Sequence, residues 1–109
     1  MPASWDEFER LQLTVGRVTS VEDFPEARNP AYKLTIDFGP LGERRSSAQL
    51  THYSKDELVG RQVVCVLGFA PKRIAGFPSE VLVTGALSDA HGVVLLAPDR
   101  DVEPGSAIG

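Results

Sequence analysis

Alternation of hydrophobic and polar residues divides much of the chain into short strands. It is most regular over 33–39, where every second residue is apolar, as in a strand with one buried face. The segment 11–24 also alternates, and its phase shifts after Gly16, which indicates a bent or bulged strand. Further strands are expected at 43–50, 62–69, 80–87 and 92–98, the last one short.

Capping signals and turn residues fill the gaps between these strands. Ser4 and Glu7 have the spacing of a capping box, and so have Ser54 and Glu57. We therefore expect a short helix at the N-terminus and a second one over 54–60. The remaining connections are expected to be loops and turns at 25–32, 39–42 and 70–79, followed by a polar, loop-like tail over 99–109.

The order of these elements predicts an all-β fold in a single domain, residues 1–109, with its core over about 11–87. Three strands, a short helix and two more strands form the pattern of the OB-fold, a five-stranded β-barrel. The short helix lies between strands 3 and 4, and an N-terminal helix and a C-terminal extension are added at the ends. Because OB-fold ligands bind over strands 2 and 3, between the loops that follow strands 1 and 4, the expected site lies between the loops 25–32 and 70–79.

The net charge of −4 is unevenly distributed along the 109 residues. Residues 1–27 and 74–109 each carry −4, whereas residues 28–73 carry +4. A basic middle between acidic ends predicts one anion-attracting face, since its cations belong to the strands and loops of the expected site. The alternative is a chance clustering of charges that forms no patch in space. The overall acidity argues mildly against tight binding of RNA.

The predicted groove combines cations with hydrogen-bonding, apolar and aromatic side chains. Its residues are Arg28, Tyr32, Lys33, Arg45, Ser47, Gln49, Lys72, Arg73, Ile74, Phe77 and Ser79. Arginine offers a planar fork of donors and lysine a compact mobile charge, which suits RNA phosphates as well as peptide groups. Tyr32 and Phe77 offer stacking surfaces to unpaired bases or apolar contacts to a peptide. The same chemistry therefore fits both an extended peptide and an RNA.

Several of these residues also have a purely structural interpretation. Lys72 and Arg73 can be solvated charges of a turn, because exposed charges contribute little on their own. Phe77 can anchor its loop on the mouth of the barrel, and Tyr32 can belong to the barrel edge. Glu80 opposes the basic character of the groove, so we expect it to pair with Arg73 or to order the loop.

Few residues of this chain suit catalysis or a cofactor. Cys65, the single cysteine, lies in an apolar strand and is typical of a small buried residue. His52 and His91 are far apart and have no acidic or cysteine cluster at metal-ligand spacing. With no nucleophile elbow or phosphate-binding glycine loop, the sequence predicts a non-enzymatic protein without metal or cofactor. The lack of a signal peptide and of a long apolar run predicts a cytoplasmic protein without membrane insertion.

Five segments, in order along the chain, carry a family resemblance that extends over about residues 11–109. They are VGRVTSVEDFPEA, YKLTIDFG, SSAQLT, ELVGRQVV and PKRIAGFPSEVLVTGA. Together they resemble the tRNA-binding domain family, whose OB-folds occur as free-standing dimers and as appendages of aminoacyl-tRNA synthetases. The long segment FPEARNPAYKL and the run Ser46–Gln49 depart from the synthetase-appended pattern and are similar to CsaA, the group of export-related bacterial chaperones.

The resemblance implies a cytoplasmic homodimer that binds unfolded preproteins and peptides, with tRNA and the export machinery as further partners. The apolar runs VVCVL, VLV and VVLL agree with a dimer, because a lone barrel needs apolar residues only on its inner face. We expect the terminal extensions to take part in that dimer, and the alternative is that they cover these runs within one chain. The alternative functions are structure-specific tRNA binding and a dimeric scaffold without a functional groove.

Overall fold

The structure, a computed structural model, describes all residues from 1 to 109. Its first half contains α1 (Trp5–Leu11), β1 (Leu13–Asp23), β2 (Tyr32–Asp37), the 3₁₀ turn η1 (Gly39–Leu41), β3 (Glu43–Ala48) and α2 (Lys55–Leu58). Its second half contains β4 (Gln62–Val66), β5 (Lys72–Ile74), β6 (Phe77–Ser79), β7 (Leu82–Val83), β8 (Gly85–Ser88) and β9 (Gly92–Leu95). No helix is long and apolar enough to cross a membrane.

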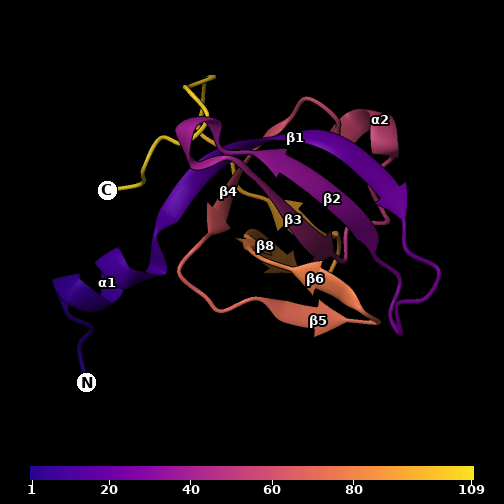
Figure 1. Cartoon of the computed structure of the whole chain (residues 1–109), viewed down its shortest axis with the longest axis horizontal. Helices are drawn as coiled ribbons and strands as arrows, with labels where there is room; N and C mark the ends of the chain where they lie inside the picture. The colour runs from indigo at the N-terminus through magenta and orange to yellow at the C-terminus, as the bar shows by residue number, and fades with distance from the viewer.

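Five strands form one antiparallel sheet in the order β3-β2-β1-β4-β7, which curls into a nearly closed barrel (Figure 1). The hairpins β5–β6 and β8–β9 extend it as separate two-stranded sheets. The short helix α2 stands between β3 and β4, and its capping box is formed by Ser54 and Glu57. The predicted all-β OB-fold is therefore confirmed.

Strand β1 is long enough to pair on both sides because it bends. Its C-terminal half pairs with β2, its N-terminal half pairs with β4, and the register shifts between Val18 and Ser20. A Cβ atom on Gly16 would lie 2.5 Å from Ile36 Cγ2 and 2.6 Å from the ring of Phe38. The phase shift in the sequence thus marks a bulged strand whose glycine allows the core to approach closely.

The barrel interior is filled by the alternating apolar residues of these strands. The core consists of Val18, Tyr32, Leu34, Ile36, Phe38, Leu50, Leu58, Val63, Cys65, Leu67 and Val81. Each fully buried leucine, isoleucine or phenylalanine contributes roughly 1.5–3 kcal/mol relative to an exposed one. Leu58 of α2 is fully buried, so the capped helix adds a side chain to the same core.

Two predictions for the second half of the chain are wrong. The expected turn over 70–79 is the hairpin β5–β6, in which Ala75 and Gly76 both have positive φ, 47° and 81°. Such a two-residue turn matches the twist of a hairpin. The expected strand 80–87 is divided at Thr84. The amide of Thr84 donates to Val64 while its carbonyl accepts from Leu96, so the chain changes partner strand there.

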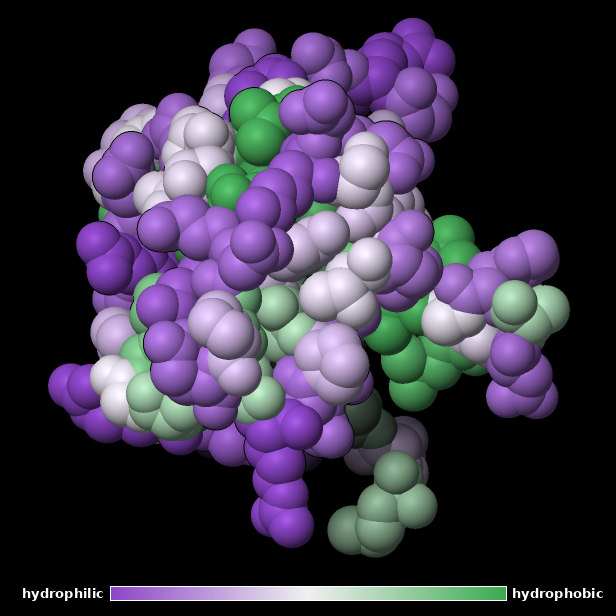
Figure 2. Space-filling view, turned by 90° about the vertical axis from the view of Figure 1, so that its right-hand side faces the viewer, coloured by the Kyte–Doolittle hydropathy of each residue, from purple (hydrophilic) through white to green (hydrophobic).

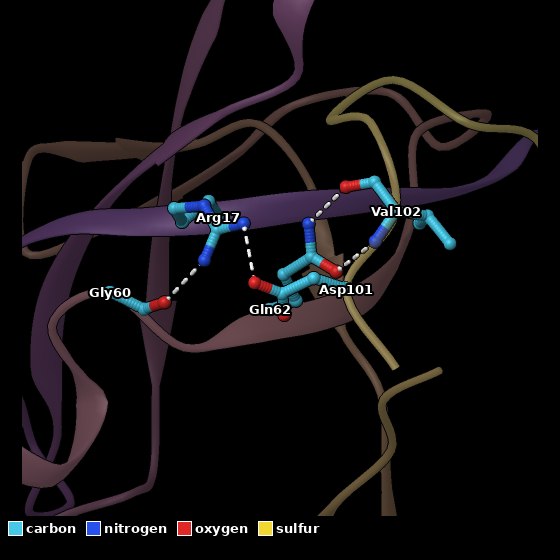
Figure 3. A network of polar contacts seen from close by, with 5 residues as sticks. All are labelled: Arg17, Gly60, Gln62, Asp101 and Val102. Atoms are coloured by element: carbon cyan, nitrogen blue, oxygen red, sulfur yellow. Dashed lines mark hydrogen bonds and ion pairs between the residues drawn. The ribbon is translucent and has the colours of Figure 1, made fainter. Parts of the chain in front are cut away.

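The C-terminal tail is bound to the barrel through β1 and β4. Val15 N donates to Ser106 O at 2.9 Å, and Gly105 N donates to Val15 O at 2.7 Å. Figure 3 shows a second attachment, in which Gln62 makes hydrogen bonds of 2.6 and 3.0 Å with the main chain of Val102. In the same network Arg17 donates to Gly60 O and pairs with Asp101.

Helix α1, unlike the C-terminal tail, is not held along the barrel. It projects from the barrel in Figure 1, none of its residues is buried, and Trp5 is 80% exposed. Its capping box between Ser4 and Glu7 is present as predicted. The tail is therefore bound to its own barrel, whereas the helix leaves Trp5 exposed and its other apolar residues, Phe8 and Leu11, only half-buried.

Candidate ligand-binding site

The β5–β6 hairpin is attached to the free edge of β3 through its last residue, Ser79, and through Glu80, which follows it. Glu80 N donates to Arg45 O at 2.7 Å, and Arg45 N donates to the carboxylate of Glu80 at 2.8 Å. Ser47 N donates to Ser79 Oγ at 3.0 Å. Of the two roles expected for Glu80, it therefore has the second: it orders the loop and does not pair with Arg73.

The hairpin also meets the connection between β1 and β2. The rings of Phe24 and Phe77 lie 5.5 Å apart in an edge-to-face arrangement, which is favourable for aromatic pairs. Lys33 Nζ lies 4.9 Å from the centre of the first ring and 5.4 Å from the second, a double cation–π contact. We call Phe24, Lys33 and Phe77 the Lys33 cluster. The two predicted ligand loops thus converge beside β2.

A groove of about 830 Å³ lies between the end of β3, the hairpin and strands β7 and β8. Ten of its 17 lining residues are hydrophobic, among them Phe69, Ile74, Val83 and Leu87. Its only charged side chains are those of Lys72 and Glu80, one of each sign. Such an apolar lining with few polar groups is typical of ligand sites.

The structure distributes the eleven predicted site residues over several places. The groove contains Ser47, Gln49, Lys72, Ile74 and Ser79. The Lys33 cluster contains Lys33 and Phe77. Arg45 lies on the same face of the sheet as Lys33, because it pairs with Thr35, which is two residues from Lys33 in β2. Arg28 is exposed in the loop between β1 and β2.

Two of the predicted residues make hydrogen bonds within the chain. Tyr32 is 8% exposed in the core and its hydroxyl donates to Tyr53 O at 2.9 Å, so its ring is not available for stacking on a base. Arg73 follows Lys72 in β5 and therefore points to the opposite face of the hairpin. Its guanidinium donates to Gly76 O at 2.7 Å across the turn. The dipeptide thus divides into one groove residue and one turn residue.

Other groups of chemical interest lie inside structural contacts. Cys65 is buried, and this burial raises the pKa of its thiol to about 12. His52 Nε2 lies 2.8 Å from Val93 O. The backbone and side chain of Ser54 hold the pKa of the Glu57 carboxyl below its usual range. No group of three or more His, Cys, Asp or Glu side chains is arranged to hold a metal ion.

Sequence reasoning missed Phe24, Phe69 and Leu87. Phe24 follows β1 directly and marks the start of its loop, whereas Phe69 follows β4 after a glycine. Leu87 is 86% exposed although it belongs to a strand. An aromatic residue next to a loop was the available signal for the first two residues, and none was available for the third.

Three apolar side chains, of which Leu82 also lines the groove, are exposed, and we call them the outer patch. Leu82 is 50% exposed, Val94 40% and Leu96 47%. Strand β8, beside them, lies at the far side of the barrel in Figure 1. That side is turned to the right in Figure 2, where hydrophobic surface gathers, while the face toward the viewer is mostly hydrophilic. Neither terminal extension covers the three residues completely.

Comparison with known proteins agrees with this architecture. The family model described as "Putative tRNA binding domain" matches residues 13–107. The CsaA chaperone proteins of Picrophilus torridus and Bacillus anthracis are each 47% identical, with TM-scores of 0.93 and 0.92 over 99% and 100% of this chain and the whole of theirs.

A more distant group consists of synthetases. The methionine–tRNA ligase of Thermococcus onnurineus is 33% identical over 95% of this chain, which corresponds to 14% of the ligase. The chain thus spans about a seventh of the length of the curated relatives it matches. From the family match and the shared fold, the chain belongs to the tRNA-binding domain family, in which it is similar to the CsaA chaperones.

Proposed function

We propose that this protein is a CsaA-like homodimeric chaperone of the cytoplasm. It binds unfolded segments of exported proteins in the groove, without ATP and without catalysis, and it delivers them to the export machinery. The groove carries this proposal, because ten of its 17 lining residues are hydrophobic and its two charges balance. A polyanion has little to bind there, whereas an apolar peptide segment can bury its side chains.

The homodimer is proposed from the outer patch and the projecting helix. Val94, Leu96 and Leu82 at the rim of the groove remain exposed, and exposed apolar surfaces commonly mark interfaces. Trp5 of α1 is exposed as well. A second copy that covers both surfaces would explain why several strands are apolar on each face, and it would give the N-terminal extension a role in the dimer.

Binding of tRNA is the second candidate function, and the Lys33 cluster favours it. Lys33 and Arg45 lie on the strand face that OB-folds use for nucleic acids. Phe77 is half-buried beside them, and its ring can stack with an unpaired base, while the buried Phe24 supports that ring from below the surface. The exposed Arg28 lies in the adjoining loop. This surface lies next to the groove, so one molecule can carry both ligand types.

The two functions are separated by titrating two ligands at two salt concentrations. The probes are an unfractionated tRNA and a capped, fluorescein-labelled octapeptide of alternating leucine and serine. We expect the peptide to bind with little salt dependence, and the tRNA affinity to fall steeply as salt rises. In parallel, we expect the protein to suppress the aggregation of chemically denatured citrate synthase.

Three results would contradict these proposals. Absence of peptide binding together with unchanged aggregation of citrate synthase removes the chaperone function. Absence of tRNA binding at low salt removes the second candidate. Sedimentation as a monomer at micromolar concentration removes the homodimer.

A further inference from the structure

One wall of the groove is an unpaired strand edge. Strand β8 pairs only with β9, with Gly85 opposite Leu95 and Leu87 opposite Val93. Val93 O lies 2.8 Å from His52 Nε2, and Leu95 N donates to the hydroxyl of Tyr53. The main-chain groups of these two β9 residues therefore point away from β8.

The opposite residues on β8 must point away from β9 as well. In an antiparallel pair, two facing residues direct their main-chain groups either toward each other or both outward. Gly85 and Leu87 thus present their N–H and C=O groups on the free edge of β8, where neither residue has a hydrogen-bond partner. Both residues line the groove.

The opposite wall of the groove is formed by β3, whose main-chain donors already have hydrogen-bond acceptors. The amides of Arg45 and Ser47, which face the free edge of β3, donate to the side chains of Glu80 and Ser79. These side chains take the positions that a further strand would need. The β8 wall of the groove therefore offers free donors and acceptors that the β3 wall does not.

The spacing of the free groups suits an extended chain. Gly85 and Leu87 are two residues apart in a strand, about 6.6 Å, which is also the repeat of alternate residues in an added strand. The floor of the groove is apolar, and its charges, Lys72 and Glu80, cancel. This surface matches an uncharged main chain with apolar side chains on one face.

We propose that the groove binds its ligand as an added β-strand on the edge of β8. The ligand is an extended polypeptide segment whose main chain pairs with Gly85 and Leu87 while its alternate side chains enter the groove. Recognition by main chain makes binding tolerant of sequence, because every peptide carries the same donors and acceptors. The inference rests on the proposed peptide binding and adds the mode of recognition.

N-methylation of the peptide tests this mode directly. The leucine–serine octapeptide is prepared with N-methyl groups on all leucines, on all serines, or on none. We expect one of the two methylated peptides to lose at least about tenfold in affinity, because its amides can no longer donate to the β8 edge. Equal binding of all three peptides would overturn the added strand and leave the chaperone proposal intact. Failure of the unmethylated peptide to bind would instead refute the chaperone proposal.

A pair of variants tests the protein side. Leu87→Pro and Leu87→Ala both remove the leucine side chain, and only the proline also removes the free N–H, which lies outside the β8–β9 pairing. We expect Leu87→Pro to bind the peptide about tenfold more weakly than Leu87→Ala, at a similar melting temperature. Equal affinities of the two variants would overturn the proposal. A loss of the dimer in Leu87→Pro with unchanged peptide binding would assign the edge to a second copy and would also overturn it.

Discussion

The groove and the Lys33 cluster lie side by side and differ in what they offer a ligand. The groove is apolar, its charges balance, and one wall is an open strand edge. The Lys33 cluster has a cation between two aromatic rings, with Arg45 on the same face. The hairpin β5–β6 contributes Ile74 to the first and Phe77 to the second, so one short element serves two kinds of chemistry.

This difference shows how a single OB-fold surface can serve two ligand types. The cation–aromatic combination suits phosphates and flat bases, whereas the apolar groove suits side chains that leave water. Because the two regions adjoin at β3 and β6, a substitution can affect one and leave the other intact.

Charge reversal in the Lys33 cluster is expected to have the largest effect. The double variant Lys33→Glu with Arg45→Glu should lower tRNA affinity about 100-fold at low salt, since each lost phosphate contact is worth about tenfold. Peptide affinity should change less than about twofold, because neither residue lines the groove. Both are measured by fluorescence anisotropy.

The matched control for this reversal is Arg10→Glu with Arg100→Glu, which changes the net charge equally on the exposed surface of α1 and the tail. If the control lowers tRNA affinity as much as the first variant does, total charge and not the Lys33 cluster determines binding. The proposed role of the Lys33 cluster in tRNA binding would then be refuted.

Polar substitution in the groove is expected to have the next largest effect. Ile74→Ser with Phe69→Ser removes two apolar lining residues, so peptide affinity should fall about 30-fold, given roughly 25 cal/mol for each Å² of apolar burial lost. The tRNA affinity should stay within about twofold. Leu41→Ser is the control, because Leu41 is a similarly exposed apolar residue outside the groove. An equal loss of affinity in this control would show that the groove does not hold the peptide.

The barrel could be predicted from the sequence because its signals are local. The alternation over 33–39, the two capping boxes and the bulge after Gly16 all correspond to observed features. Each records a preference of the chain for one backbone geometry and one buried face. The order of strands and helices then determines which loops flank the ligand face.

The division of the site could not be predicted in the same way. Strands β5 and β6 have three residues each, and the second contains Pro78, so neither shows a periodicity that can be recognised. The alternation that places Lys72 in the groove and Arg73 on the other face appears only once this hairpin is known. The turn residues before it predict a loop that includes Tyr32, whereas pairing with Ala48 makes Tyr32 a buried strand residue.

Weakening the attachment of the hairpin β5–β6 to β3 should lower the affinity of both regions moderately. Glu80→Ala removes the acceptor of the Arg45 amide, so the free energy of unfolding should fall by about 1 kcal/mol, as for a typical hydrogen bond. Affinities for peptide and tRNA should both fall by about threefold, because both regions depend on the position of the hairpin. The measurements are urea unfolding and the two titrations.

Glu80→Gln is the control because it keeps an oxygen that can accept from the Arg45 amide. It should restore most of the stability and both affinities. If the glutamine variant instead binds tRNA much more tightly than the natural protein, the carboxylate of Glu80 acts by repelling the phosphates and not by fixing the hairpin to β3.

The smallest effect is expected at the turn. Arg73→Ala removes one exposed hydrogen bond to Gly76 O, so the free energy of unfolding should change by about 0.5 kcal/mol and both affinities by less than about twofold. The salt dependence of tRNA binding should keep its slope, because in this structure Arg73 points to the opposite face of the hairpin from Lys72 and Phe77. A slope reduced by about one unit would mean that Arg73 contacts a phosphate. The guanidinium would then leave Gly76 on binding, and the RNA surface would extend around the tip of the hairpin to its other face.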